Sequence, residues 1–156
     1  WHSAINFGGN LSDYTVWLLE RSMKTLGLRV KAQTANAMQM AKWLKNHNHI
    51  KNVYYPGLES HPEHSLAKSQ MHGFGAMLSF ELTEDIDALR FQKQLKLIKS
   101  SMSLAGVEST VISPTPEERQ KVGISDQLIR FSVGIEEPED LQQDINQAIT
   151  QIINKL

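Results

Sequence analysis

The stretch LIRFSVGI, residues 128–135, constrains the fold most, because it alternates like a β-strand that is buried on one face. Side chains on a strand point to opposite faces with a period of two. One face is then wholly apolar and holds Ile129, Phe131, Val133 and Ile135. The other face holds Leu128, Arg130, Ser132 and Gly134. We therefore predict a sheet that packs one face on a core and turns the other toward water or a ligand.

Arg130 stands on the second face, and the strand alone leaves two interpretations of it open. The first is an ordinary solvated arginine on the wet side of a sheet. The second is a guanidinium placed to bind an anion, because its planar fork matches a carboxylate or phosphate in two parallel hydrogen bonds.

Periodicity predicts the other elements. Residues 12–47 have a helical pattern, which we interpret as two helices that meet near Gly27, since glycine is unfavourable inside a helix. Further helices are predicted over residues 62–70, 83–97 and 116–122, and strands over 52–55 and 75–82. Residues 101–112 are predicted to be extended. A final helix begins at Pro138 with a buried stripe of Leu141, Ile145, Ala148, Ile149, Ile152 and Leu156. The predicted fold class is α/β of the α+β two-layer kind, a mostly antiparallel sheet covered by helices on one face.

Composition narrows the classes of function. The chain has 156 residues, which suits one domain, and a formal net charge of −1 without a basic stripe, so we expect no nucleic-acid partner. No apolar run is long enough to span a bilayer, and we expect no membrane partner. The chain has no cysteine, which excludes disulfides and thiolate catalysis. The start WHSAINFGG has no signal-peptide pattern, and we expect a cytoplasmic location.

Two charged motifs are interpreted conservatively. His61 and His64 of SHPEH lack a second pair of ligands at a recognisable spacing, so we expect a solvated loop and no metal. The run EEPED, residues 136–140, opens the last helix, where carboxylates favour the helix dipole.

Several motifs together resemble a known family. They are SLAGVEST (103–110), PEER (116–119) and GISDQLIRFSVGIEEPEDL (123–141), with WLLERSMKTLGLR (17–29), NAMQMAKWL (36–44) and residues 53–82 upstream. In this order they resemble the C-terminal part of the trans-sulfuration enzymes, the pyridoxal-phosphate (PLP)-dependent Cys/Met metabolism family.

The resemblance implies a fold and a set of site residues. The fold is the small C-terminal domain of fold-type I PLP enzymes. Arg130 corresponds to the arginine that binds the α-carboxylate of the amino-acid substrate. Ser103 corresponds to the serine of the family's S-L-G-G segment at the same end of the site, and Met102, just before it, to a residue that helps set substrate preference. Ala105 replaces the first glycine of that segment, and the loop at 109–116 is shorter than in the family.

The resemblance also implies what this chain does not contain. The Schiff-base lysine of the family lies in an S-x-T-K motif, followed by G-H-x-D, and neither motif occurs here. We therefore expect no catalytic and no cofactor-binding residue in this chain, PLP bound by a large domain absent from it, and no activity of these residues alone. Residues 1–156 form a single C-terminal domain in this interpretation. Residues 1–47 are a helical connector and long helix, and 48–156 are the sheet and its helices.

The resemblance favours cystathionine γ-synthase, which joins an O-acylhomoserine to cysteine. Cystathionine β-lyase, O-acetylhomoserine sulfhydrylase and methionine γ-lyase are alternatives, and a stand-alone, non-catalytic binding module is a further one. The partners implied are an amino-acid substrate (an O-acylhomoserine, cysteine or cystathionine) and further copies of the intact enzyme, as a homo-oligomer and typically a tetramer.

Overall fold

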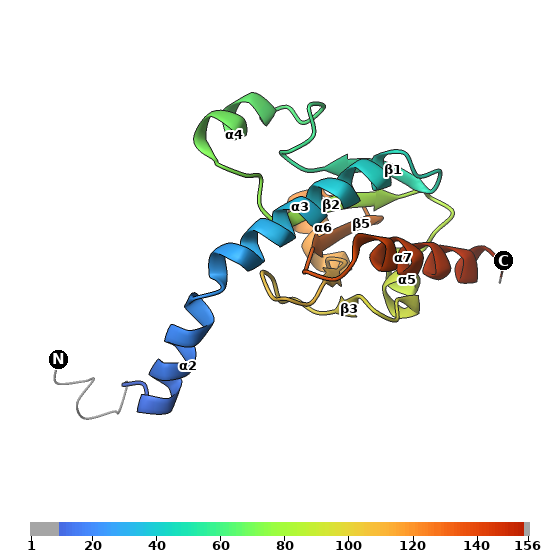
Figure 1. The fold of residues 1–156 in the computed structure, drawn as a ribbon. Helices are drawn as coiled ribbons and strands as arrows, with labels where there is room; N and C mark the ends of the chain where they lie inside the picture. Colours follow the sequence, from blue (N-terminus) through green and yellow to red (C-terminus); the bar gives the residue numbers. More distant parts are fainter. Residues whose placement is uncertain (1–9, 155–156) are drawn as a thin grey trace.

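A computed structural model describes residues 10–154 of the chain. Residues 1–9 of the predicted connector and Leu156 of the predicted last stripe lie outside the described residues. The elements are, in order, α2 (Asp13–Met23), α3 (Leu26–Lys45), β1 (Ile50–Tyr54), α4 (His64–Gln70), β2 (Met77–Leu82), α5 (Ala88–Gln94), β3 (Lys99–Ser100), β4 (Thr110–Ile112), α6 (Pro116–Val122), β5 (Leu128–Ser132) and α7 (Pro138–Ile153). Figure 1 shows a layered body from which α2 extends away.

The strands form a sheet in the order β1-β2-β5-β4-β3. The pairs β1–β2, β2–β5 and β4–β5 are antiparallel, and only β3 runs parallel to its neighbour β4. The prediction of a mostly antiparallel sheet is confirmed. β5 lies at the centre, so its residues have a strand on either side.

The apolar face of β5 lies in the core, as its alternation predicted. Ile129, Phe131 and Val133 are fully buried, whereas Ile135 is 45% exposed because the strand ends at Ser132. The predicted burial of Ile135 was therefore wrong. Helices α3, α5 and α7 cover this face, and α7 buries its predicted stripe over the described residues. The core also includes Met40, Leu44, Leu78, Phe80, Leu82, Phe91 and Val111.

The first helical segment consists of two helices, as predicted, and the break between them lies at Lys24 and Thr25, just before Gly27. Gly27 stands in the first turn of α3, and a Cβ added there would meet nothing within 4 Å. The break is stabilised by Arg29, whose Nη2 donates to the backbone carbonyl of Ser22 at 2.8 Å. This side-chain contact satisfies a carbonyl that the end of α2 leaves without a helical partner.

The helix predicted over residues 83–97 is much shorter, because α5 spans only Ala88–Gln94. Asp87 begins it as an N-cap and accepts a hydrogen bond from the backbone N–H of Arg90 at 2.6 Å. After α5 the chain is extended, because the carboxylate of Asp144 on α7 binds the backbone N–H groups of three consecutive residues, 96–98.

The remaining boundaries differ by about two residues: α4 begins at His64, β1 spans Ile50–Tyr54 and β2 begins at Met77. Residues 101–109, predicted as extended, form a loop between β3 and β4. No helix within residues 10–154 is long and apolar enough to cross a membrane.

Candidate functional site

Arg130 lies at the middle of β5, on the face opposite the helices. Its strand partners are Ser79 on β2 and Ile112 on β4. Its Nη2 donates to the backbone carbonyls of Met102, at 2.8 Å, and Ser103, at 3.2 Å. The structure thus brings together the three residues to which the family resemblance assigns a substrate-binding role.

The contact is made through backbone atoms of the loop. The Met102 side chain is 73% exposed and does not enter these hydrogen bonds, and Ser103 is exposed as well. Among residues 10–154, no hydrogen-bond partner occupies Nε or Nη1 of Arg130. A guanidinium held at one nitrogen, with its other donors open, can accept an anion through charge-assisted hydrogen bonds.

The loop around Ser103 is held by hydrogen bonds from β4 and β5. The Thr110 hydroxyl donates to the carbonyl of Ser103 at 3.1 Å, which is the same carbonyl that Arg130 contacts. The backbone N–H of Ala105 donates to the buried hydroxyl of Ser132 at 3.0 Å. Ala105 has φ of 60°, a left-handed conformation that favours glycine. The glycine that the family carries at this place thus has a local conformational reason.

The far end of the loop is fixed by Glu136. Its carboxylate accepts the backbone N–H of Ser109 at 2.6 Å and the hydroxyl of Ser109 at 2.8 Å. That hydroxyl in turn accepts the backbone N–H of Gly134 at 2.8 Å. A Cβ on Gly134 would collide with the carbonyl of Val107 and with the Glu136 side chain, so only glycine fits. The sequence shows Glu136 only as part of an acidic run at a helix start, and nothing in that pattern predicts its hydrogen bonds to Ser109.

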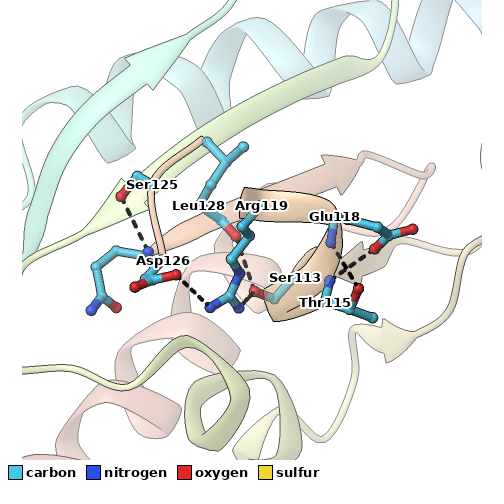
Figure 2. A network of polar contacts seen from close by, with 8 residues as sticks. Ser113, Thr115, Glu118, Arg119, Ser125, Asp126 and Leu128 are labelled. Carbon is cyan, nitrogen blue, oxygen red and sulfur yellow. Dashed lines mark hydrogen bonds and ion pairs between the residues drawn. The ribbon is translucent and has the colours of Figure 1, made fainter. Parts of the chain in front are cut away.

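Figure 2 shows a second network, which fixes the start of β5. Arg119 is buried on α6, and its Nη2 donates to the Ser113 hydroxyl at 2.7 Å while its Nη1 pairs with Asp126 at 3.2 Å. The Ser113 hydroxyl donates to the carbonyl of Leu128, two residues before Arg130. The sequence showed Arg119 only within the PEER motif. Its partners, Ser113 and Asp126, lie just outside that motif, six and seven residues from Arg119 along the chain.

Helix α6 begins with a capping box. The Thr115 hydroxyl accepts from the Glu118 backbone N–H, and the Glu118 carboxylate accepts from the Thr115 backbone N–H at 2.8 Å. This backbone hydrogen bond lowers the pKa of Glu118 below its usual value. Gly123 ends the helix at φ of 67°, in the left-handed conformation typical of a C-terminal glycine. Both ends of α6 are thus specified locally, and the helix holds Arg119 in place.

A shallow cavity of about 380 Å³ lies on the same sheet face, beside Ser79. Tyr54, Glu81 and Leu128 line it together with the turn after α6. Glu81 accepts the Asn52 amide at 2.6 Å. Burial, followed by the Glu81 charge, raises the pKa of Tyr54. This face therefore carries the Arg130 guanidinium and the Glu81 carboxylate, and Ser79 lies beside Arg130 on β2.

The histidine loop has local contacts. His64 shares a hydrogen bond with the carbonyl of Pro56 at 2.8 Å and stacks on Phe74, and His61 accepts the backbone N–H of Glu63. Within the described part of the chain, no three His, Cys, Asp or Glu side chains gather as a metal site would need.

PLP requires a lysine that bonds to it and groups that hold its ring and phosphate. The residues paired with Arg130 in the sheet or hydrogen-bonded to it are Ser79, Ile112, Met102 and Ser103, and no lysine is among them. The described residues of this site do not fit the cofactor by themselves, whereas the open donors of Arg130 have the chemistry that binds an anion.

Comparison with known proteins identifies the family. A family model described as Cys/Met metabolism PLP-dependent enzyme matches residues 2–150. The chain belongs to this family. The resemblance noted from the motifs is thereby confirmed.

The relatives of the chain are trans-sulfuration enzymes. Chloroplastic cystathionine gamma-synthase 1 of Arabidopsis thaliana is 46% identical over 154 residues, which is 93% of this chain and 27% of that protein. Cystathionine gamma-lyase of Bacillus subtilis is 45% identical over 153 residues, 93% of this chain and 40% of that protein. The chain thus spans well under half of the length of these relatives.

Solved structures of the family share the fold. An O-acetylhomoserine sulfhydrylase of Wolinella succinogenes matches with a TM-score of 0.84 and 36% identity, over 93% of this chain and 41% of that one. A cystathionine gamma-lyase from Lactobacillus plantarum complexed with L-serine matches with a TM-score of 0.84 and 39% identity, over 94% and 41%. The predicted fold, that of the small domain of fold-type I PLP enzymes, is therefore confirmed.

Proposed function

We propose that this chain is the substrate-carboxylate domain of a PLP-dependent trans-sulfuration enzyme, and that Arg130 binds the α-carboxylate of its amino-acid substrate. The observation that supports the proposal is the geometry of Arg130. Its Nη2 is held by two loop carbonyls, while Nε and Nη1 have no partner within residues 10–154. A carboxylate bound there has a defined orientation, which is how positioning lowers a reaction barrier.

The loop residues have supporting roles in this proposal. Ser103 contributes the carbonyl that aims Arg130 and an exposed side chain at the mouth of the site. Met102 offers an exposed thioether next to it, where a substrate side chain is discriminated by apolar contact. PLP supplies the electron sink when it is bound, and we assign its binding to a large domain outside this chain.

Among the reactions of the family, we favour γ-replacement on an O-acylhomoserine with cysteine, which is the cystathionine γ-synthase reaction. A relative of that name at 46% identity supports this choice. Cystathionine β-lyase, O-acetylhomoserine sulfhydrylase and methionine γ-lyase are the alternatives. The intact enzyme is proposed to be a cytoplasmic homo-oligomer, typically a tetramer. Residues 1–47 serve as its connector and long helix, and residues 48–156 as its sheet and helices.

A chimera tests the proposal. The part of the Bacillus subtilis cystathionine gamma-lyase that precedes the matched region is joined in frame to Trp1. Turnover is then measured with O-acylhomoserine plus cysteine and, separately, with cystathionine. Arg130→Ala removes a charge-assisted pair worth about 1.5–3 kcal/mol, so kcat/KM should fall about 10- to 150-fold. The absorbance of bound PLP should persist.

The matched control is Arg90→Ala, which removes an exposed arginine on α5, in the helical layer on the other side of the sheet. It should leave kcat/KM within a factor of two or so. Unchanged turnover in the Arg130→Ala chimera would contradict the carboxylate role. The 156-residue chain alone is expected to show no turnover with PLP, since its sequence contains no S-x-T-K lysine motif.

A further inference from the structure

Helix α2 exposes an unusual amount of apolar surface. None of its residues is buried, and even the apolar side chains of Trp17 and Leu19 are 53% and 51% exposed. The exposed large apolar side chains here are those of Leu11, just before the helix, and of Tyr14, Val16, Trp17, Leu18, Leu19 and Met23. Soluble proteins rarely leave a contiguous apolar surface of this kind uncovered.

The apolar residues of α2 lie on two opposite sides of the helix. Successive residues are about 100° apart around a helix axis. Tyr14, Trp17 and Leu18 therefore share one side, and Val16, Leu19 and Met23 share the other.

Polar residues separate the two sides. Asp13 and Glu20 lie along one seam, where Glu20 pairs with Lys24 at 3.0 Å, and Thr15 and Ser22 lie along the other. A helix that is apolar on opposite sides is covered on both, since a single partner explains only one stripe. Helix α7, whose stripe is buried along one side, shows the single-stripe pattern in this chain.

The exposed surface continues onto the first half of α3. Leu26, Leu28 and Val30 are 48%, 72% and 47% exposed. Beyond them lies a largely apolar groove of about 630 Å³, lined by Val30, Met38, Met71 and neighbouring residues. The second half of α3 is different, because Met40 and Leu44 are fully buried in the core. Exposed apolar side chains thus occur along α2 and the first half of α3. This is the part of the chain that extends from the body in Figure 1.

We propose that α2 is a docking helix that is covered on both sides by the remainder of a full-length trans-sulfuration polypeptide, the part that this chain's relatives carry outside the matched region. The relatives support this occupant: the same fold matches with TM-scores of 0.84 and accounts for only 41% of each solved chain. The proposal rests on family membership and is independent of the carboxylate role of Arg130.

The test compares one set of variants in the 156-residue chain and in the chimera described above. Trp17→Glu and Leu19→Glu place a carboxylate on each apolar side. Ser22→Glu, in a polar seam of the same helix, is the matched control. In the 156-residue chain all three should leave the denaturation midpoint unchanged, because α2 contacts no core there. In the chimera, Trp17→Glu and Leu19→Glu should each lower the midpoint by several degrees, and Ser22→Glu should not.

Hydrogen exchange gives a second readout that does not depend on activity. The amides of α2 should exchange about 100-fold or more slowly in the chimera than in the 156-residue chain. Equal exchange in the two proteins would overturn the proposal, as would a chimera sensitive to only one of the two glutamate substitutions. Reversible dimerisation of the 156-residue chain that both substitutions abolish would overturn it too, because a second copy would then cover α2. A chimera without turnover, in which the α2 amides nevertheless exchange slowly, would contradict only the proposed function.

Discussion

Replacement of Asp144 is the most direct test of how this fold is held together. Asp144 lies on α7 and is only 6% exposed. Its carboxylate accepts the backbone N–H groups of Lys96, Leu97 and Ile98, each at 2.9 Å, and the side-chain amide of Gln147 at 3.0 Å. This side chain binds the segment that follows α5 to α7, next to a second bond from the Gln147 amide to the carbonyl of Gln94 at 2.7 Å.

The expected magnitude follows from these bonds. A hydrogen bond to a charged group contributes about 1.5–3 kcal/mol, and neighbouring bonds are not additive. Asp144→Asn keeps the size of the side chain but turns an N–H₂ group toward backbone donors, so it should lose at least one of the bonds and cost about 2–3 kcal/mol. Asp144→Ala leaves three N–H groups without their acceptor and should cost about 3–5 kcal/mol.

The assay is urea denaturation of the 156-residue chain and its variants, analysed at equal slope. Asp140→Asn is the matched control, because Asp140 is an exposed carboxylate in the first turn of the same helix. It should cost no more than about 1 kcal/mol through the helix dipole. A cost of less than about 1 kcal/mol for Asp144→Asn would refute the reasoning, since the carboxylate would then add nothing beyond shape.

Three further predictions concern single positions. Burial raises the pKa of Tyr55 from 10 to about 12. The un-ionised phenol therefore stabilises the fold fully below pH 10, and this contribution is lost as the pH rises through 12. An ultraviolet titration should show a late tyrosinate phase that Tyr55→Phe removes. Gly134→Ala forces a Cβ against the Val107 carbonyl and should destabilise the chain by about 1–3 kcal/mol in urea denaturation, and a neutral result would mean that the loop yields freely. Ala105→Gly relieves a left-handed φ of 60° and should raise the free energy of unfolding by about 0.5–1 kcal/mol, after the entropy of glycine in the unfolded chain is subtracted. A lower free energy of unfolding in urea denaturation would show that the left-handed conformation is not strained.

The periodic elements were predictable from sequence because each depends on residues close along the chain. The alternation of β5 predicted that Ile129 and Phe131 are buried and that Arg130 lies on the opposite face. The single stripe of α7 predicted which side of that helix packs on the sheet. Family motifs then selected Arg130, Ser103 and Met102, which the structure brings together through backbone contacts.

Element boundaries were less predictable, since side chains from elsewhere decide them. α5 ends where Asp144, some 46 to 48 residues later, binds the extended segment. The break between α2 and α3 is held by Arg29 reaching back to Ser22, and glycine, the residue that marked the break in sequence, stands inside α3. Helical periodicity carries no information about such contacts.

The sequence by itself determined the sheet face on which Arg130 stands and the family to which the chain belongs, because period-two alternation and ordered motifs are local properties. Only the tertiary structure decided how that arginine is aimed. Glu136 fixes the loop end at Ser109 across 27 residues, and Ser132 binds Ala105 across the same separation. Each bond has one buried partner, Ser109 or Ser132, whose polar groups must find partners once water is excluded. Which partner each group finds depends on the packing of the whole chain.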